Sequence, residues 1–284
     1  MKKILLILLL LNTFILANIK TVVSILPEKT FLEAIGGDKV DITLMVLPGN
    51  SPHTYEPKPS QMRAITQASL YFAIGVEFEK VWLPKFKDLN PQMQIIDLSA
   101  GIERLPMASG HHHESGDEHS TQESMDPHIW TAPRNVEKIA QKIYEALSKA
   151  DHSNEPYYRE NLERFLQKIA RTDSQIRKIL SAKAEGASFM VFHPSWGYFA
   201  KAYGLTQIPV EVEGKSPKPR ELVSIIKEAK QKHISAIFTQ PEFSDSSARV
   251  IASELHIPVI KVSPLAPDWS ENLIRIAKAI AGVR

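Results

Sequence analysis

The chain has 284 residues, of which 43% are hydrophobic and 23% are charged, and it contains no cysteine. This composition is typical of a globular protein of about two domains. Lys and Arg total 34 against 32 Asp and Glu, and the two counts become equal without Lys2 and Lys3. A neutral chain has no basic surface for a phosphate backbone, so we expect no nucleic-acid partner. The lack of cysteine excludes disulfides, thiolate metal sites and a cysteine nucleophile.

The first 17 residues have the layout of a secretory signal peptide. Two lysines precede an apolar run from Ile4 to Leu11, and the segment ends on the small residue Ala17. That run is much shorter than the ~20 residues needed to span a bilayer. We therefore expect cleavage after Ala17, which removes residues 1–17 and leaves the product free in the periplasm. No cysteine follows the apolar run, so the pattern does not predict a lipoprotein.

Short β-rich runs alternate with helical patterns along the rest of the chain. Most of these runs are continuously apolar, which is typical of parallel strands that are covered on both faces. The predicted strands are 21–26, 41–47, 69–75, 94–98, 188–192, 207–212, 235–240 and 258–263, and the clearest helices are 135–148, 220–232, 247–255 and 271–281. The alternation predicts an α/β fold with two lobes, residues 18–152 and 185–284, each built on a mainly parallel sheet of about four strands.

A long helix is predicted between the lobes, in residues 153–184. Its apolar residues keep to one face from Tyr158 to Leu180, and neither Gly nor Pro occurs between Pro156 and Ala184. A continuous helix from Glu155 to Ala184 would be roughly 45 Å long at 1.5 Å per residue. Such a rigid connection favours a small hinge motion between the lobes over a wide opening.

Residues 107–125 break the α/β pattern. The segment carries His111, His112, His113 and His119 together with several acidic residues, and it has no large apolar side chain between its terminal methionines. It can bury too little apolar surface to offset the entropy of ordering, so we expect a mobile loop. Clustered imidazoles and carboxylates also suit divalent metals, which leaves an auxiliary metal-binding role open beside that of an inert solvated loop.

Three other histidines follow the carboxyl ends of predicted strands. His53 follows the strand that ends at Leu47, His128 follows the last strand of the first lobe, and His193 directly follows the first strand of the second lobe. Open α/β sheets bind ligands at this edge, and a proline close to each histidine stiffens its backbone. Neutral imidazole nitrogen is a good donor for Zn²⁺, so three converging rings would form a zinc site. A single histidine at a strand end is usually a surface residue, and the prediction depends on the three occurring together.

Four segments resemble the metal-binding solute receptors of ABC transporters, in particular their periplasmic zinc-binding subunit. These segments are Pro52–Pro57 (PHTYEP), Asp126–Trp130 (DPHIW), Phe192–Phe199 (FHPSWGYF) and the His-rich acidic insertion before His128. The resemblance covers nearly the whole chain after the leader. It implies two (β/α)4 lobes joined by a long helix, with His53, His128 and His193 holding the metal in the cleft between the lobes.

The sequence departs from the family at the fourth metal ligand. Many members have an aspartate immediately before a Pro-Leu pair that follows the last strand, whereas this chain has Ser263 there. Asp268 from the same loop, Glu242, Ser263 itself or a water molecule could complete the metal's coordination, and the sequence leaves these possibilities open. Loss of a carboxylate shifts the donor set toward nitrogen, which favours zinc over the oxygen-preferring manganese.

The resemblance implies a high-affinity receptor that carries Zn²⁺, as transported ligand, to a membrane permease driven by a cytoplasmic ATPase. The chain has no G-x-x-x-x-G-K-[ST] phosphate loop and no membrane-spanning run, so both partners must be separate chains. We expect a monomer without enzymatic activity. Two different functions remain open, a receptor for manganese or a chelated metal on the same fold and a secreted zinc hydrolase. The hydrolase is disfavoured because the chain has no H-E-x-x-H motif and the three histidines come from both lobes.

Overall fold

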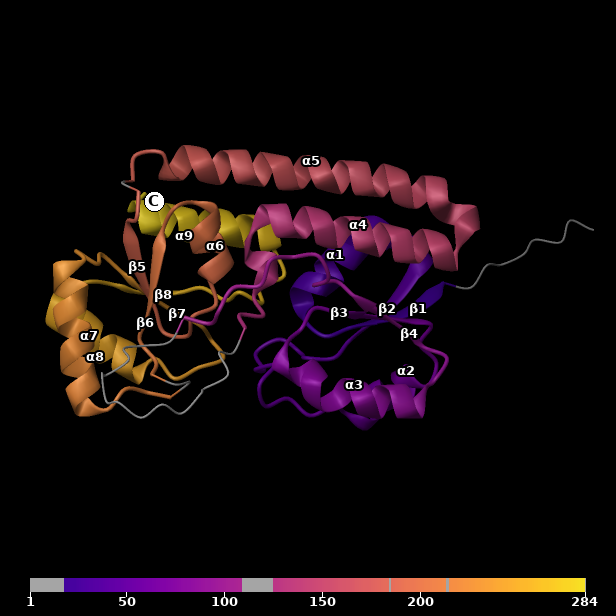
Figure 1. Cartoon of the computed structure of the whole chain (residues 1–284), viewed down its shortest axis with the longest axis horizontal. Coiled ribbons are helices and arrows are strands. Elements are labelled where there is room, and N and C mark those ends of the chain that lie inside the picture. Colours follow the sequence, from indigo (N-terminus) through magenta and orange to yellow (C-terminus); the bar gives the residue numbers. More distant parts are fainter. Residues whose placement is uncertain (1–17, 109–124, 184, 213–214, 284) are drawn as a thin grey trace, which may run out of the picture.

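The computed structural model describes residues 18–108, 125–183, 185–212 and 215–283. The predicted leader and residues 109–124 of the His-rich segment lie outside these ranges. The described chain forms two lobes, each built on a four-stranded parallel sheet (Figure 1). This arrangement confirms the predicted α/β fold.

All eight predicted strands form, each within three residues of its expected bounds. The N-lobe sheet has the order β2-β1-β3-β4, and the C-lobe sheet has the order β6-β5-β7-β8. The strands are β1 (Ile19–Val23), β2 (Val40–Leu44), β3 (Leu70–Ala73), β4 (Gln94–Asp97), β5 (Ser188–Val191), β6 (Thr206–Pro209), β7 (Ile237–Thr239) and β8 (Val259–Lys261). In each sheet the order reverses beside the lobe's first strand, which creates the crevice where parallel sheets bind ligands.

Helices cover both faces of each sheet, as the connections between parallel strands require. They are α1 (Leu26–Gly36), α2 (Pro59–Ile65), α3 (Glu77–Leu89), α4 (Pro133–Ala150), α5 (Glu155–Leu180), α6 (Gly197–Ala202), α7 (Pro219–Gln231), α8 (Ser246–Leu255) and α9 (Trp269–Ala281). In the N-lobe α1 and α4 lie on one side of the sheet and α2 and α3 on the other (Figure 1). No helix in the described ranges is long and apolar enough to cross a membrane.

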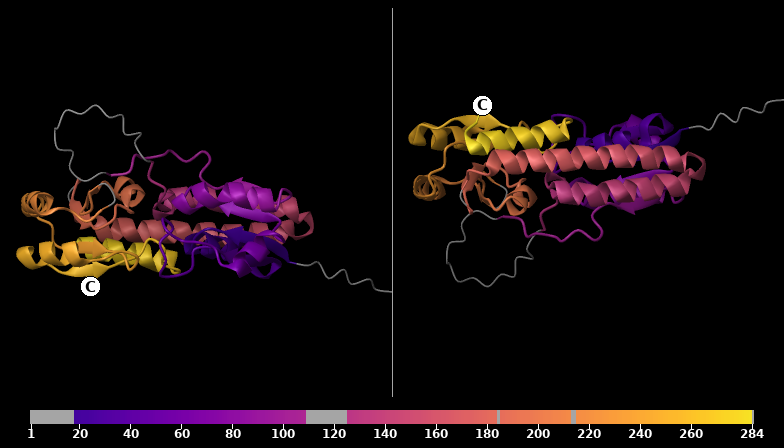
Figure 2. Two further views of the ribbon diagram at one scale, coloured as in Figure 1. Left: turned by 90° about the horizontal axis from the view of Figure 1, so that it is seen from below. Right: turned by 90° about the horizontal axis from the view of Figure 1, so that it is seen from above.

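Helix α5 runs along both lobes. It packs against α1 and α4 of the N-lobe and against α9 of the C-lobe, as the views from below and from above also show (Figure 2). Its 26 residues make a helix of roughly 39 Å, somewhat shorter than predicted. The helix ends at Leu180, the last large apolar residue of its buried face, and the Ser181 hydroxyl donates to the Lys178 carbonyl. The four residues after Leu180 include no large apolar side chain that could bury another turn.

Aromatic side chains connect the lobes beneath α5. The Phe31 ring of α1 lies 5.7 Å from the rings of both Phe165 on α5 and Trp269 on α9, measured between centroids. The Trp130 indole N–H donates to the Pro264 carbonyl at 2.8 Å, and the Trp269 indole donates to the Trp130 carbonyl at 2.8 Å. The apolar core is therefore continuous from one lobe to the other.

A buried polar cluster lies at the crevice of the N-lobe sheet, between the ends of β1 and β3. The Ser24 hydroxyl donates to Glu79 Oε1 at 2.5 Å, and its oxygen lies 2.8 Å from the Tyr71 hydroxyl. Glu28 accepts from the Ser24 amide at 3.0 Å. Glu79 also accepts from the Ile74 and Gly75 amides at 3.0 and 2.7 Å. These bonds fix the loop between β3 and α3, which continues into the cavity described below.

Candidate metal centre

His53, His128 and His193 come together in one small cavity between the lobes. The His193 ring lies 5.3 Å from the His53 ring and 5.4 Å from the His128 ring, measured between centroids. The cavity volume is about 20 Å³, which is room for about one water molecule. The residues that line it are Ser51, Pro52, His53, Val76, Glu77, Pro127, His128, Trp130, His193, Ser195, Gln240, Glu242, Phe243, Pro264 and Leu265. They follow strands of both sheets, so the cavity lies where the carboxyl edges of the two sheets meet.

His193 is held from several sides. Its Nδ1 lies 2.8 Å from Glu211 Oε1, and the side chains of both residues are less than a tenth exposed. The Gln240 amide group donates to the His193 carbonyl at 2.7 Å, and the Phe243 ring stacks on the imidazole at 4.7 Å. His193 Nε2 is buried and has no hydrogen-bond partner. Since a carboxylate accepts the Nδ1 proton, Nε2 is left with a free lone pair that suits a metal.

His128 has the same type of support. Asp126 Oδ1 lies 2.7 Å from His128 Nδ1 and also accepts from the His128 backbone amide at 2.8 Å. Both side chains are almost fully buried. The carboxylate therefore fixes the ring orientation and leaves Nε2 as the nitrogen available to a ligand.

His53 is the least constrained of the three rings. It lies in the connection between β2 and α2, and about a third of its side chain is exposed. Its Nδ1 is 3.5 Å from Glu77 Oε2, which is too long for a good hydrogen bond. Burial lowers the pKa of His53, and the negative charge of Glu77 acts in the opposite direction. The neutral form of His53 is therefore favoured, which is the form that binds a metal.

Of the predicted fourth ligands, Glu242 is the one that lines the cavity. Its Oε1 accepts a hydrogen bond from the Ser263 hydroxyl at 2.8 Å, and Ser263 Oγ in turn accepts from the Leu265 amide. Ser263 thus supports Glu242 from outside the cavity lining. Asp268 is exposed and directly precedes α9, away from the lining residues. The loop histidines His111, His112, His113 and His119 lie outside the described residues.

The three rings share a cavity without forming a finished coordination shell. Two imidazoles on one tetrahedral zinc have ring centres roughly 5 Å apart, given Zn–N distances of about 2.0–2.1 Å. Both separations from His193 are close to this value. In the part of the chain that the structure describes, however, no group of three or more His, Asp or Glu side chains is placed to hold a metal ion. A site of three histidines would therefore require a rearrangement of these side chains.

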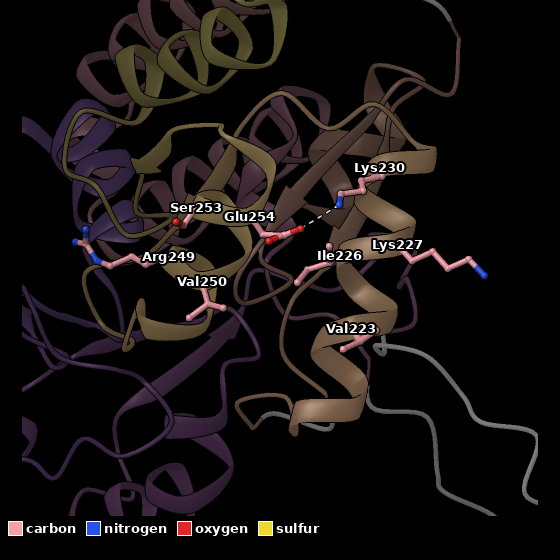
Figure 3. Close-up of a pocket in the computed structure, with 8 residues that line it drawn as sticks. All are labelled: Val223, Ile226, Lys227, Lys230, Arg249, Val250, Ser253 and Glu254. Carbon is pink, nitrogen blue, oxygen red and sulfur yellow. Dashed lines mark hydrogen bonds and ion pairs between the residues drawn. The ribbon is translucent and has the colours of Figure 1, made fainter.

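A much larger hollow lies between α7 and α8, on the far side of the C-lobe (Figure 3). Its volume is about 910 Å³, and its floor includes the exposed or half-buried apolar residues Val223, Ile226 and Val250. Lys230 and Glu254 form an ion pair of 3.1 Å across it. No histidine is among its lining residues, so it offers no donor set for a zinc ion.

Sequence reasoning missed three carboxylates of the site, Asp126, Glu211 and Glu77. Glu77 and Glu211 each follow closely on the end of a strand, β3 or β6, so the rule that singled out the histidines could have found them. Asp126 stands two residues before His128, a spacing that allows the observed contact. Nothing in the sequence indicated which carboxylate would contact which imidazole ring.

Comparisons with known proteins identify the family of this chain. A family model described as "Zinc-uptake complex component A periplasmic" matches residues 21–282. A solved structure of ZnuA is 40% identical, superposes with a TM-score of 0.84, and is matched over 93% of this chain and 98% of that one. The high-affinity zinc uptake system protein ZnuA of Bacillus subtilis is 29% identical over 244 residues, which are 84% of this chain and 76% of that protein.

Relatives named for manganese also match. The manganese ABC transporter substrate-binding lipoprotein PsaA of Streptococcus anginosus is 26% identical over 237 residues, which are 79% of this chain and 73% of that protein. The family model covers most of the chain, and the identity to the ZnuA structure is higher than to this manganese relative. The chain belongs to the family of periplasmic A components of zinc-uptake complexes.

Proposed function

We propose that this protein is a high-affinity zinc receptor that binds Zn²⁺ between its lobes and delivers it to an ABC permease. The observation that carries the proposal is the convergence of His53, His128 and His193 on one cavity of about 20 Å³. The buried and unpartnered Nε2 of His193 supports it, because an unsatisfied polar atom in a tight cavity is costly without a ligand. The ion is the cargo of the protein and is released intact.

Glu242 is the proposed fourth ligand. It lines the cavity, and the Ser263 hydroxyl holds one of its oxygens. Three imidazole nitrogens and one carboxylate are a donor set that suits zinc, whereas manganese prefers more oxygen ligands. We therefore expect Mn²⁺ to compete poorly with Zn²⁺ in a titration of the metal-free protein. Tighter binding of Mn²⁺ than of Zn²⁺ would favour the manganese receptor instead.

The size of the cavity also favours a receptor for a bare ion over a receptor for a chelated metal and over a hydrolase. A volume of about 20 Å³ accepts an ion or a water molecule and excludes a chelated metal or a peptide. We therefore propose a non-enzymatic protein that acts as a monomer in the periplasm. Its partners are a membrane permease and a cytoplasmic ATPase, and residues 18–152 and 185–284 serve as the two lobes joined by the helix within residues 153–184.

A chelator-competition titration tests the proposal directly. We compare the metal-stripped protein, residues 18–284, with His128→Ala and with a deletion of residues 109–123. His152→Ala is the matched control, because the exposed His152 lies between α4 and α5, away from the cavity lining. We expect one tight zinc site that survives the deletion and the control substitution and is lost in His128→Ala. Loss of tight binding with the deletion, or its survival in His128→Ala, would mean that the receptor site lies elsewhere.

A further inference from the structure

The first residues of α6 in the C-lobe lie beside Asp126, the N-lobe residue whose carboxylate orients His128. We propose that Gly197 and Tyr198 are positioning residues for zinc binding: they hold Asp126, and through it His128, in the geometry that the metal needs. This inference rests on the proposed function, since it takes His128 as a zinc ligand. Neither residue lines the cavity, so neither acts by touching the ion.

Gly197 leaves room for the Asp126 carboxylate. A Cβ atom added at Gly197 would lie 2.6 Å from Asp126 Oδ2, well inside the contact distance of two such atoms. The other oxygen of the same carboxylate, Oδ1, is held by the ring and the amide of His128. A side chain at position 197 would therefore force the carboxylate to rotate, and the rotation would break its bonds to His128. Gly197 does not have a positive φ, so an alanine meets no backbone strain there.

Tyr198 fixes the backbone of the same residue. Its hydroxyl donates to the Asp126 carbonyl at 3.1 Å and accepts from the Leu105 amide at 3.1 Å. The Asp126 amide donates to the Leu105 carbonyl at 2.8 Å, so one buried hydroxyl bridges the two chain segments that meet there. Gly197 thus leaves the space that the side chain of Asp126 occupies, and Tyr198 holds its main chain.

Because of these contacts, we expect zinc binding to depend on how the two lobes pack against each other. Residues 193–198 form one continuous segment that supplies the ligand His193 and also holds Asp126 of the opposite lobe. If the lobes separate at this point, Asp126 loses the bond from the Tyr198 hydroxyl, and its carboxylate is held less firmly against the His128 ring. Contact between the lobes and a correctly aimed His128 are therefore expected to form together.

A double-mutant cycle separates this role from a general structural one. Zinc affinity is measured by chelator competition for the metal-stripped protein, Gly197→Ala, Asp126→Ala and the double variant. We expect Gly197→Ala to weaken binding about tenfold or more, the range found for groups that orient metal ligands. In the Asp126→Ala background the same substitution should change affinity less than about twofold, because the group on which it acts is gone.

Two further variants and one spectrum complete the test. Tyr198→Phe keeps the packing and removes only the hydroxyl, and it should weaken binding by roughly threefold to tenfold. Lys201→Gln is the matched control: it breaks the 2.7 Å pair with Glu103, also an α6 contact to the N-lobe, and should leave zinc affinity unchanged. In metal-free protein, NMR should detect the His128 Nδ1 proton as a slowly exchanging downfield signal that disappears in Gly197→Ala.

The outcomes distinguish this inference from the proposed function. If His128→Ala and Asp126→Ala both leave zinc affinity intact, the site itself is misplaced. If those variants weaken binding while Gly197→Ala and Tyr198→Phe do not, only the positioning role is wrong. An equal loss from Gly197→Ala in both backgrounds would also overturn it, because the effect would then bypass Asp126.

Discussion

In two of the three candidate ligands, a buried carboxylate contacts the ring nitrogen that is turned away from the cavity. Asp126 serves His128 in this way and Glu211 serves His193, at 2.7 and 2.8 Å. Such a carboxylate selects the tautomer with a proton on Nδ1, orients the ring and makes Nε2 more basic. The chemistry of the site therefore depends on five or more side chains rather than on three histidines.

The Glu211 carboxylate can be tested without changing the size of the side chain. Glu211→Gln removes the negative charge beside His193, so we expect the affinity for zinc to fall about tenfold or more. Chelator competition measures the change, with Glu254→Gln on the surface of α8 as the matched control. An unchanged affinity in Glu211→Gln would show that the contact is only structural.

The pH dependence of zinc binding follows from the imidazoles. Each ring must be neutral to bind the ion, and burial lowers the pKa of His53 from its ordinary 6.5. Protons therefore compete with zinc at His53 only below that value. Titrations from about pH 7.5 to about pH 5.5 should show binding that weakens toward the acidic end. An affinity that does not change over this range would contradict a site of three histidines.

The sequence was sufficient to predict that the three histidines converge, but not which carboxylates contact their rings. His53, His128 and His193 could be predicted because each follows a strand and stands in an unusual, proline-containing segment. Glu211 lies 18 residues after His193, and whether the two meet depends on the paths of β5 and β6. Glu242 could be named only as one of several fourth ligands, because its link to Ser263 joins residues 21 apart.

At the level of elements, the long helix and four others were predicted from their apolar faces, whereas α1, α2, α3 and α6 were not among the helices named. The long helix α5 was predicted from its apolar face, and its end differs by four residues because that face stops at Leu180. The short helices α2 and α6 have seven and six residues, too few for a 3.6-residue period to be recognised. That gap matters for function, because α6 begins with the two residues that hold Asp126.

The first turn of α3 contains a buried carboxylate with a raised pKa. Burial raises the pKa of Glu79 from 4.5 to about 7, against the effect of its hydrogen bonds. The folded protein thus keeps a proton that the unfolded chain loses near pH 4.5, so the contribution of Glu79 to stability is complete below that pH and lost as the pH rises to about 7. The slope approaches about 1.4 kcal/mol per pH unit for one proton.

Urea unfolding of the metal-free protein between pH 5 and pH 8 measures this effect. Relative to wild type, Glu79→Gln should flatten the decline of the unfolding free energy with pH, although it also loses an acceptor for the Gly75 amide. Wild type should therefore lose unfolding free energy relative to Glu79→Gln as the pH rises from 5 to 8. Parallel pH profiles for the two proteins would mean that Glu79 titrates normally in the folded state.

At the level of the whole molecule, the lobes are joined by more than a linker. Helix α5 packs on both of them, and Phe31, Phe165 and Trp269 form one aromatic group beneath it. The Trp130 indole adds a hydrogen bond across the interface, to Pro264. Opening the lobes widely would expose this apolar core to water, so zinc binding should be accompanied by small movements only.

Distances between spin labels test this rigidity. The chain has no native cysteine, so Lys87→Cys on α3 and Lys227→Cys on α7 provide two unique labelling sites, both exposed. We expect the mean distance between the labels to change by less than about 5 Å when zinc is added. A change of 10 Å or more would indicate the wide opening that α5 is expected to prevent.

The position of the bound ion tests the central claim most directly. We would crystallise the zinc-loaded protein and locate the metal from anomalous diffraction at the zinc absorption edge. We expect one strong peak in the interlobe cavity, about 2.0–2.1 Å from Nε2 of His53, His128 and His193, with an oxygen of Glu242 as the fourth ligand. A fully occupied zinc ion elsewhere, with an empty cavity between the lobes, would contradict it.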